Sequence, residues 1–425
     1  MDKAIFTIRR KVLLETLKEG VLFLMGAPEP AGLGGAGRFY QNRDLLYYTG
    51  LPEPAAAALF KPRHPKPFTL FVLPRDPVAE KWTGKRYGAE GAMESFGADQ
   101  AFPVGQWAER LYEALVGEKT LYYRWGDNET ADLAVLQVLQ RLRKEQRADR
   151  VPVQVVDSGQ MTFPQRLVKS QEEIELLKGA AAIAKKAMDR TYAGTEPGMW
   201  EYQVQAIVEE TYRMNGADGP SFPTISAAGA HGTCMHYAEN SGRIEPGEFL
   251  LLDTGCSYRE YACDITRTFV PRGKAKPVQK AVWDAVFDVQ KKMIGLIRPG
   301  ISLCELNQIS QREVAQKCID LGILKQRLDE VMEKNLHKEY YPHRMGHWIG
   351  LDVHDAGSWG MEDTAVLLKP GMALTVEPGI YVPTDCPEHC KKFAGVGVRL
   401  EEDVVVTETG HEVITREIPV LMETT

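Results

Sequence analysis

Two segments of the chain repeat each other, and each ends in a carboxylate at the same place. Residues 245–253 read Glu-Pro-Gly-Glu-Phe-Leu-Leu-Leu-Asp, and residues 369–377 read Lys-Pro-Gly-Met-Ala-Leu-Thr-Val-Glu. Each is a Pro-Gly turn followed by an apolar strand that carries an acid, Asp253 or Glu377, at its end. A buried carboxylate is costly unless a cation meets it. Two acids in matching positions therefore predict a shared cationic partner, which we take to be a pair of metal ions.

A third acid follows the first repeat. A two-residue turn at Tyr258-Arg259 would pair Asp253 with Asp264 on one face of a hairpin, with Cβ atoms roughly 5 Å apart. Two carboxylates at that separation repel unless a metal ion or a shared proton intervenes. The alternative is a hydrogen-bonded acid pair capped by Thr266 or Arg267.

The second repeat supplies a fourth acid and a group of imidazoles. Residues 396–401 alternate like a half-buried strand and place Glu401 as the counterpart of Asp264, opposite Glu377. Residues 343–354 add three histidines, which are His343, His347 and His354. Four carboxylates with imidazoles suit divalent manganese, cobalt or zinc. Two such ions roughly 3.5–4 Å apart can activate water and polarise a carbonyl.

Bulk composition excludes several classes of protein. The chain has 425 residues, of which 44% are hydrophobic, so two domains with full cores are expected. A net charge of −7 gives no electrostatic reason to expect nucleic acid. No apolar run approaches the roughly 20 residues that span a bilayer, and the N-terminus lacks a signal-peptide core. Seven cysteines without framework spacing predict a reduced, cytoplasmic compartment. Cys386 and Cys390 have no second pair of ligands nearby, which disfavours a zinc site there.

The first 160 or so residues predict a mixed α/β domain that shapes the molecule rather than doing chemistry. Apolar periodicity indicates helices at Val12–Lys18, Ala108–Leu115 and Ala131–Glu145, and buried strands at Val21–Met25 and Thr69–Leu73. The glycines of residues 32–37 match a dinucleotide pattern but lack the strand–turn–helix context that makes it work, so a surface loop is expected.

Residues beyond about 165 predict a second, internally duplicated domain. Ser170 to Glu173 form a capping-box pattern that opens a helix over Ile174–Tyr192. Pro-Gly turns then precede helices over Tyr202–Met214 and Leu303–Leu321. We expect two similar α+β halves around a pseudo-twofold axis, with their sheets facing a common cleft.

These residues resemble a known family. Residues 165–420 are similar to the "pita-bread" metallopeptidases, which include methionine aminopeptidase, prolidase and aminopeptidase P. The motifs are Leu-Leu-Asp253-Thr-Gly-Cys, Cys-Asp264-Ile-Thr-Arg-Thr-Phe, His347-Trp-Ile-Gly-Leu-Asp-Val-His354-Asp, Val-Glu377-Pro-Gly-Ile-Tyr381 and Gly-Val-Arg399-Leu-Glu401-Glu-Asp. The segment Arg43-Asp44-Leu-Leu-Tyr47-Tyr48-Thr49-Gly50 resembles the creatinase-type domain of the proline-specific branch. Within that branch the chain looks most like aminopeptidase P, with prolidase next.

The resemblance implies a fold and a metal site. Residues 1–165 would be a creatinase-type N-terminal domain, and residues 166–425 a pita-bread catalytic domain. Asp253 would bind one metal, His347 and Glu377 the other, and Asp264 and Glu401 both. A metal-bridging hydroxide would attack the carbonyl before proline, and Glu377 would pass a proton to the leaving nitrogen.

The resemblance also implies roles for residues that bind substrate. His354 would donate to the oxyanion, and His236 would line the pocket and hold the substrate backbone. His343 would lie against the proline ring. Tyr381 and Arg399 would orient the ligands and help to hold the substrate.

The expected activity is removal of the first residue from peptides that begin Xaa-Pro. Three alternatives are a dipeptidase restricted to Xaa-Pro, a metal-free binding protein of the same fold, and creatine hydrolysis, which does not need these ligands. The resemblance implies a homodimer or homotetramer in which Trp82 reaches a neighbouring subunit's cleft; otherwise Trp82 lies in the core or on the surface of its own domain. The polar loop 383–392 is expected to shape the rim of the site.

Overall fold

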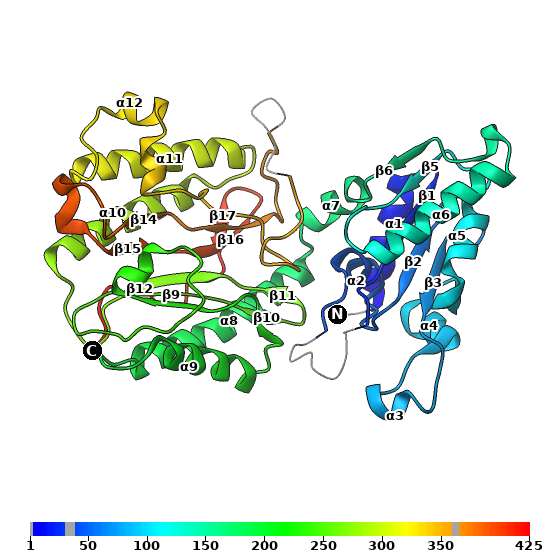
Figure 1. Ribbon diagram of the computed structural model, residues 1–425, viewed down its shortest axis with the longest axis horizontal. Coiled ribbons are helices and arrows are strands. Elements are labelled where there is room, and N and C mark those ends of the chain that lie inside the picture. Colours follow the sequence, from blue (N-terminus) through cyan, green and yellow to red (C-terminus); the bar gives the residue numbers. More distant parts are fainter. Residues whose placement is uncertain (1–2, 30–38, 359–364) are drawn as a thin grey trace. The chain divides into compact units, whose positions relative to one another are not determined.

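The computed structural model describes residues 3–29, 39–358 and 365–425 (Figure 1). The glycine-rich segment 32–37 lies outside the described residues. The chain divides into two compact units, Met1–Gln165 and Arg166–Thr425.

The first unit is built on a six-stranded mixed sheet with the order β4-β3-β2-β1-β5-β6. Its strands are β1 (Val21–Met25), β2 (Ala57–Phe60), β3 (Phe68–Val72), β4 (Gln100–Pro103), β5 (Thr120–Tyr122) and β6 (Gln154–Val156). Its helices are α1 (Lys3–Leu17), α2 (Arg43–Thr49), α3 (Glu80–Thr83), α4 (Gly88–Phe96), α5 (Trp107–Leu115) and α6 (Glu129–Glu145), and α7 (Gly159–Leu167) leads into the second unit. Leu111 of α5 and Val135 of α6 pack against Phe23 and Phe71 of the sheet. The predicted α/β character of this half is confirmed.

The second unit contains two halves of similar construction. In the first half, α8 (Gln171–Gly194) and α9 (Glu201–Met214) pack on a three-stranded sheet of order β12-β9-β8. In the second half, α10 (Pro277–Leu296) and α11 (Leu303–Asp320) pack on β13, β14, β15 and β16. Figure 1 shows the two helix pairs on opposite sides of the strands. This is the duplicated α+β arrangement that the repeat predicts.

The remaining bounds of this unit complete the frame. The first half contains β7 (Gly219–Pro220), β8 (Ile225–Ala228), β9 (Leu250–Thr254), β10 (Cys256–Tyr258), β11 (Tyr261–Ala262) and β12 (Ile265–Phe269). The second half contains α12 (Leu328–Glu333), β13 (Ala373–Val376), β14 (Gly379–Val382), β15 (Val396–Arg399), β16 (Glu402–Val406) and β17 (His411–Val413).

The predicted capping box at the start of α8 is present. The Ser170 side chain accepts a hydrogen bond from Glu173 N, and the Glu173 side chain accepts one from Ser170 N. Two of the free N–H groups at the helix start are thereby satisfied. The helix consequently begins one residue after Ser170, close to the start of the second unit.

The predicted register of the first hairpin is wrong by two residues. Tyr258 pairs with Tyr261, so the turn is Arg259-Glu260, and Asp253 pairs with Thr266 instead of Asp264. Both turn residues have positive φ, 49° and 76°, as a type I′ turn requires. A slip of two residues keeps every side chain on its own face because side chains alternate with period two. Asp264 is therefore a diagonal rather than a direct neighbour of Asp253.

The register of the second hairpin agrees with the prediction. Val376 pairs with Glu402, and Gly379 pairs with Arg399. Both pairs belong to one continuous register, which sets Glu377 opposite Glu401. The two hairpins thus bring four acids to one region, although the pairing within the two halves is not identical.

Candidate active site

The candidate residues surround a cavity of about 650 Å³ in the second unit. All of the predicted site residues except Tyr381 line it, which are His236, Asp253, Asp264, His343, His347, His354, Glu377, Arg399 and Glu401. Tyr381 is buried behind the wall, where its hydroxyl contacts both His343 and Arg399.

Backbone pairing between segments far apart in the sequence builds this site. Glu401 N donates to Thr266 O at 3.1 Å, which places the short segment between β15 and β16 beside the first hairpin. Thr375 N donates to His347 O at 2.8 Å, and this bond aligns the histidine segment with β13. Asp253 lies on β9, and Asp264, Glu377 and Glu401 each lie within one or two residues of a paired strand, so the sheets fix where these acids enter the cavity.

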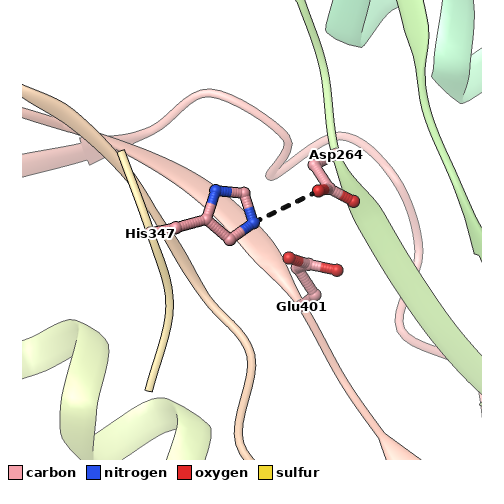
Figure 2. A group of neighbouring side chains, drawn as sticks. All are labelled: Asp264, His347 and Glu401. Atoms are coloured by element: carbon pink, nitrogen blue, oxygen red, sulfur yellow. Dashed lines mark ion pairs between the residues drawn. The ribbon is translucent and has the colours of Figure 1, made fainter. Parts of the chain in front are cut away.

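Three side chains converge closely enough to share one cation. Asp264, His347 and Glu401 each offer a ligand atom, and these atoms all lie within 4.8 Å of one another. The His347 Nε2 to Asp264 Oδ2 distance is 3.4 Å. Figure 2 shows the imidazole of His347 and the two carboxyl groups turned toward one point from three segments of the chain.

The tautomer of His347 suits metal binding. Its Nδ1 lies 3.1 Å from the carbonyl oxygen of Trp348, which can only accept a hydrogen bond. The proton therefore sits on Nδ1, and the lone pair of Nε2 faces Asp264 and Glu401. A hydrogen bond donated by the ring nitrogen that does not bind the metal commonly orients a ligating imidazole.

Two further acids flank this triad. His347 Nε2 lies 3.7 Å from Glu377 Oε1. Asp253 Oδ2 accepts a 2.5 Å hydrogen bond from Arg399 Nη2. The other oxygen of Asp253 and the Oδ1 of Asp264 are buried without a hydrogen-bond partner among the described residues. Unsatisfied carboxylate oxygens that face one cavity are what a divalent cation would use.

The electrostatics of the site also call for a cation. Burial, followed by repulsion from neighbouring acids, raises the pKa of Asp264 and of Glu401 well above their ordinary values. Burial raises the pKa of Glu377 as well, although His347 and Arg399 oppose the shift. Four carboxylates cannot all be ionised here without compensating positive charge. The donor set therefore fits a metal pair and makes this a candidate metal-binding site.

Two other histidines of the cavity, His343 and His354, are held in neutral form. Burial and the nearby Arg399 lower the pKa of His343 to about 3. Its Nδ1 faces the Arg344 carbonyl at 2.8 Å, so Nε2 accepts the hydrogen bond from the Tyr381 hydroxyl, also at 2.8 Å. Burial and His347 lower the pKa of His354, whose ring centroid lies 4.2 Å from that of His347.

The alternative of an acid pair capped by Thr266 or Arg267 does not match the structure. Thr266 Oγ1 donates to Glu401 Oε2 at 2.7 Å, and Arg267 Nη2 donates to Glu402 Oε1 at 2.8 Å. Both side chains thus bind acids of the second half of the domain.

Sequence reasoning missed several residues of the site. Asp403 Oδ2 accepts a hydrogen bond from Asp264 N at 3.0 Å and so holds the backbone of a candidate ligand. The apolar wall formed by Phe222, Pro223, Ile225 and Val353 was also not predicted. These contacts join residues distant in the sequence, and no local pattern marks them.

Two other expectations concern residues away from the cavity. Cys386 and Cys390 are buried in the hydrophobic core of the second half, and no residue of the loop 383–392 is among the described residues that line the cavity. That this loop shapes the rim of the site stays a prediction. Trp82 lies on α3 and is 85% exposed, so it belongs to the surface and not to the core of its own unit.

Two family models match the chain. "Metallopeptidase family M24" covers residues 175–408, and "Aminopeptidase P, N-terminal domain" covers residues 6–122. The Xaa-Pro aminopeptidase of Escherichia coli K12 is 37% identical over 97% of this chain and 94% of its own length. The human Xaa-Pro aminopeptidase 3 is 32% identical over 90% of this chain and 75% of its own length.

Solved structures agree with these relatives. The Pseudomonas aeruginosa aminopeptidase PepP superposes with a TM-score of 0.92 at 35% identity, covering 99% of this chain and 96% of that one. A zinc-substituted E. coli aminopeptidase P in complex with product gives a TM-score of 0.92 at 36% identity over the same shares. Within the described residues, no helix is long and apolar enough to cross a membrane. The chain belongs to metallopeptidase family M24 and has the two-domain fold of aminopeptidase P, with an aminopeptidase P N-terminal domain before the pita-bread domain.

Proposed function

We propose that the protein is a dinuclear-metal Xaa-Pro aminopeptidase, which hydrolyses the bond between the first residue of a peptide and a proline in second position. The observation that carries this proposal is the convergence of Asp264, His347 and Glu401 within 4.8 Å, flanked by two more acids, on a single cavity. Membership of family M24 and relatives named Xaa-Pro aminopeptidase support the substrate class.

In this proposal Asp253, Asp264, His347, Glu377 and Glu401 would hold the two ions, with Asp253 on one, His347 and Glu377 on the other, and Asp264 and Glu401 shared. The pair of ions, when bound, supplies an activated water and polarises the carbonyl of the scissile bond. Manganese is the proposed metal, with cobalt or zinc as alternatives, because four carboxylates and one imidazole form a mostly hard donor set. Arg399 orients Asp253 through its 2.5 Å hydrogen bond.

The protein's own side chains would do the remaining work. Neutral His354 donates an N–H to the oxygen of the carbonyl as it gains charge, a contribution of a few kcal/mol in a dry site. His236 holds the substrate backbone. The Tyr381 hydroxyl donates to Nε2 of His343, which would lie against the proline ring. Glu377 would carry a proton to the leaving nitrogen, which must be protonated to depart as an amine.

The finer assignments form part of the same proposal. We place the boundary between the N-terminal and catalytic domains at residues 165/166. Trp82 is a surface aromatic, and a homodimer or homotetramer in which it reaches a neighbouring subunit would give it a partner. A cytoplasmic location is consistent with seven free cysteines, all within the described residues.

The test compares three peptides with manganese-loaded protein. Release of glycine from Gly-Pro-Gly-Gly, with Gly-Ala-Gly-Gly left intact, is the expected result and makes the enzyme an aminopeptidase. Cleavage of Gly-Pro alone would make it a dipeptidase that uses the same chemistry. If metal binds and neither proline peptide is cut, the proposed substrate class is wrong.

A further inference from the structure

A fully buried carboxylate outside the acid cluster anchors one wall of the cavity. Glu201, the first residue of α9, has 0% exposure. Its Oε1 accepts hydrogen bonds from Ala228 N at 2.6 Å and His231 Nδ1 at 2.9 Å. Its Oε2 accepts hydrogen bonds from the Tyr237 hydroxyl at 2.9 Å and Gly242 N at 2.5 Å. One carboxylate thus uses all of its acceptor capacity on a single segment of the chain.

The four donors belong to the segment 228–242, which leaves β8 and returns beside α9. Ala228 and Gly242 are its two ends, and Glu201 N also donates to Gly242 O at 2.9 Å. The His231 ring stacks on the Tyr237 ring at a centroid distance of 4.4 Å and an angle of 29°. Glu201 therefore closes the segment into a loop at its base and ties down an aromatic pair within it.

The middle of this loop faces the cavity. Met235, His236 and Ala238 all line it. Among the described residues, none makes a hydrogen bond with the His236 imidazole, so the backbone of the loop sets the position of that ring. Gly242 approaches Glu201 so closely that a Cβ there would lie 2.9 Å from Glu201 Oε1, which is consistent with a tightly fitted base.

We propose that Glu201 is a positioning residue that fixes the loop 228–242 and thereby the place of His236 in the cavity. The inference rests on the proposed function only for the role of His236 in holding substrate. A glutamine at position 201 offers one carbonyl oxygen as an acceptor, and its NH₂ group cannot accept the hydrogen bonds that the loop 228–242 donates. At least one backbone N–H at the base of the loop then loses its acceptor, and the loop loosens.

The experiment uses the manganese-loaded full chain with Glu201→Gln, Tyr237→Phe and a control. The control is Glu210→Gln, an exposed acid on the same helix that pairs with Arg190. Hydrogen–deuterium exchange is followed in peptides covering residues 228–242, with β9 as internal reference. KM and kcat are measured on Gly-Pro-Gly-Gly, and bound metal is measured for each variant.

For Glu201→Gln we expect faster exchange in 228–242 alone, unchanged metal content, and a KM about tenfold higher with a smaller change in kcat, the size of one lost hydrogen bond to a charged group. Tyr237→Phe keeps the ring stack but removes one donor to Glu201 and the acceptor of Ser241 N, and it should shift the same quantities in the same direction by less. The control should match the wild type.

The outcomes separate the two proposals. If wild type cuts no proline peptide, the proposed function fails, and faster exchange confined to 228–242 still supports the tether. If Glu201→Gln shows the exchange rate and the KM of the wild type, Glu201 does not fix the loop 228–242 and the inference is wrong. Faster exchange with wild-type KM and kcat overturns the positioning role. If Glu201→Gln does not fold, Tyr237→Phe decides, since unchanged exchange and KM in that variant also overturn the inference.

Discussion

Removing one acid from the cluster should stabilise the metal-free protein while it destroys metal binding. Ligand atoms of Asp264 and Glu401 lie within 4.8 Å of each other in a buried site, and burial, followed by repulsion between the acids, raises the pKa of both. Two unit charges at that distance repel by about 3.5 kcal/mol at an effective dielectric constant of 20. That figure is an upper bound because a proton can neutralise one member of the pair. Asp264→Asn removes this repulsion with almost no change in side-chain volume.

The expected change in Tm follows from the same repulsion energy. A change of 1 kcal/mol moves the Tm by about 2–4 °C for a domain of about 150–250 residues. The chelated Asp264→Asn variant should therefore melt several degrees above chelated wild type at pH 7. Wild type should then gain stability when manganese is added, by about 2.7 kcal/mol at one hundred times the dissociation constant. The variant should gain little or nothing.

A second Asp→Asn change in the same unit serves as a control that should lower the stability of the metal-free protein instead of raising it. Asp355 is buried and pairs with Arg166 and with Lys169, whose Nζ lies 3.1 Å from Asp355 Oδ2. Losing one partner of a buried ion pair costs about 3–5 kcal/mol. Asp355→Asn should lower the Tm of the chelated protein and keep the gain on adding manganese. Calorimetry of the three proteins with and without metal tests the reasoning. A chelated Asp264→Asn that melts below wild type, or that keeps the full gain with manganese, would refute it.

Three further predictions concern pH, catalysis and metal content. Burial alone would raise the pKa of Asp355, but Lys169 and Arg166 lower it below its ordinary value. Its stabilising effect is therefore complete above the unfolded pKa of about 3.9 and is lost as pH falls toward the lowered folded pKa. In urea melts of chelated protein, the advantage of wild type over Asp355→Asn should shrink below about pH 4; an equal advantage at pH 3 and 6 contradicts this. His354→Ala should keep both metals and lose kcat by about 10²–10³; loss of metal would mean that its role is wrongly assigned. Glu401→Ala should abolish activity and lower bound metal while the first unit stays folded, and full activity with normal metal content would end the dinuclear proposal.

Much of the fold could be predicted from local patterns in the sequence. The strand Val21–Met25, the helix over Trp107–Leu115 and the capping box at Ser170 depend on periodicity and turn chemistry within a few residues. The repeated Pro-Gly strand ending at Asp253 and Glu377 also marked both halves of the duplicated domain before any contact was known. Such features are readable because neighbours in the chain decide them.

Contacts between distant segments decided the rest. The predicted turn at Tyr258-Arg259 and the observed turn at Arg259-Glu260 both keep the acids on one face, so alternation of side chains could not distinguish them. The hydrogen bond from Glu260 N to Asp218 Oδ2, 2.7 Å long, fastens the observed turn to a residue far from it in sequence.

The same division holds within the site. The types of the candidate ligands were visible in short motifs, but the Arg399–Asp253 contact and the Glu201 tether join residues separated by 146 and up to 41 positions. Sequence by itself determined which acids and imidazoles are available and which strands they lie on or beside. Only the tertiary structure decided how near they come and which oxygens stay unsatisfied, because those quantities depend on how the two halves pair across the cavity.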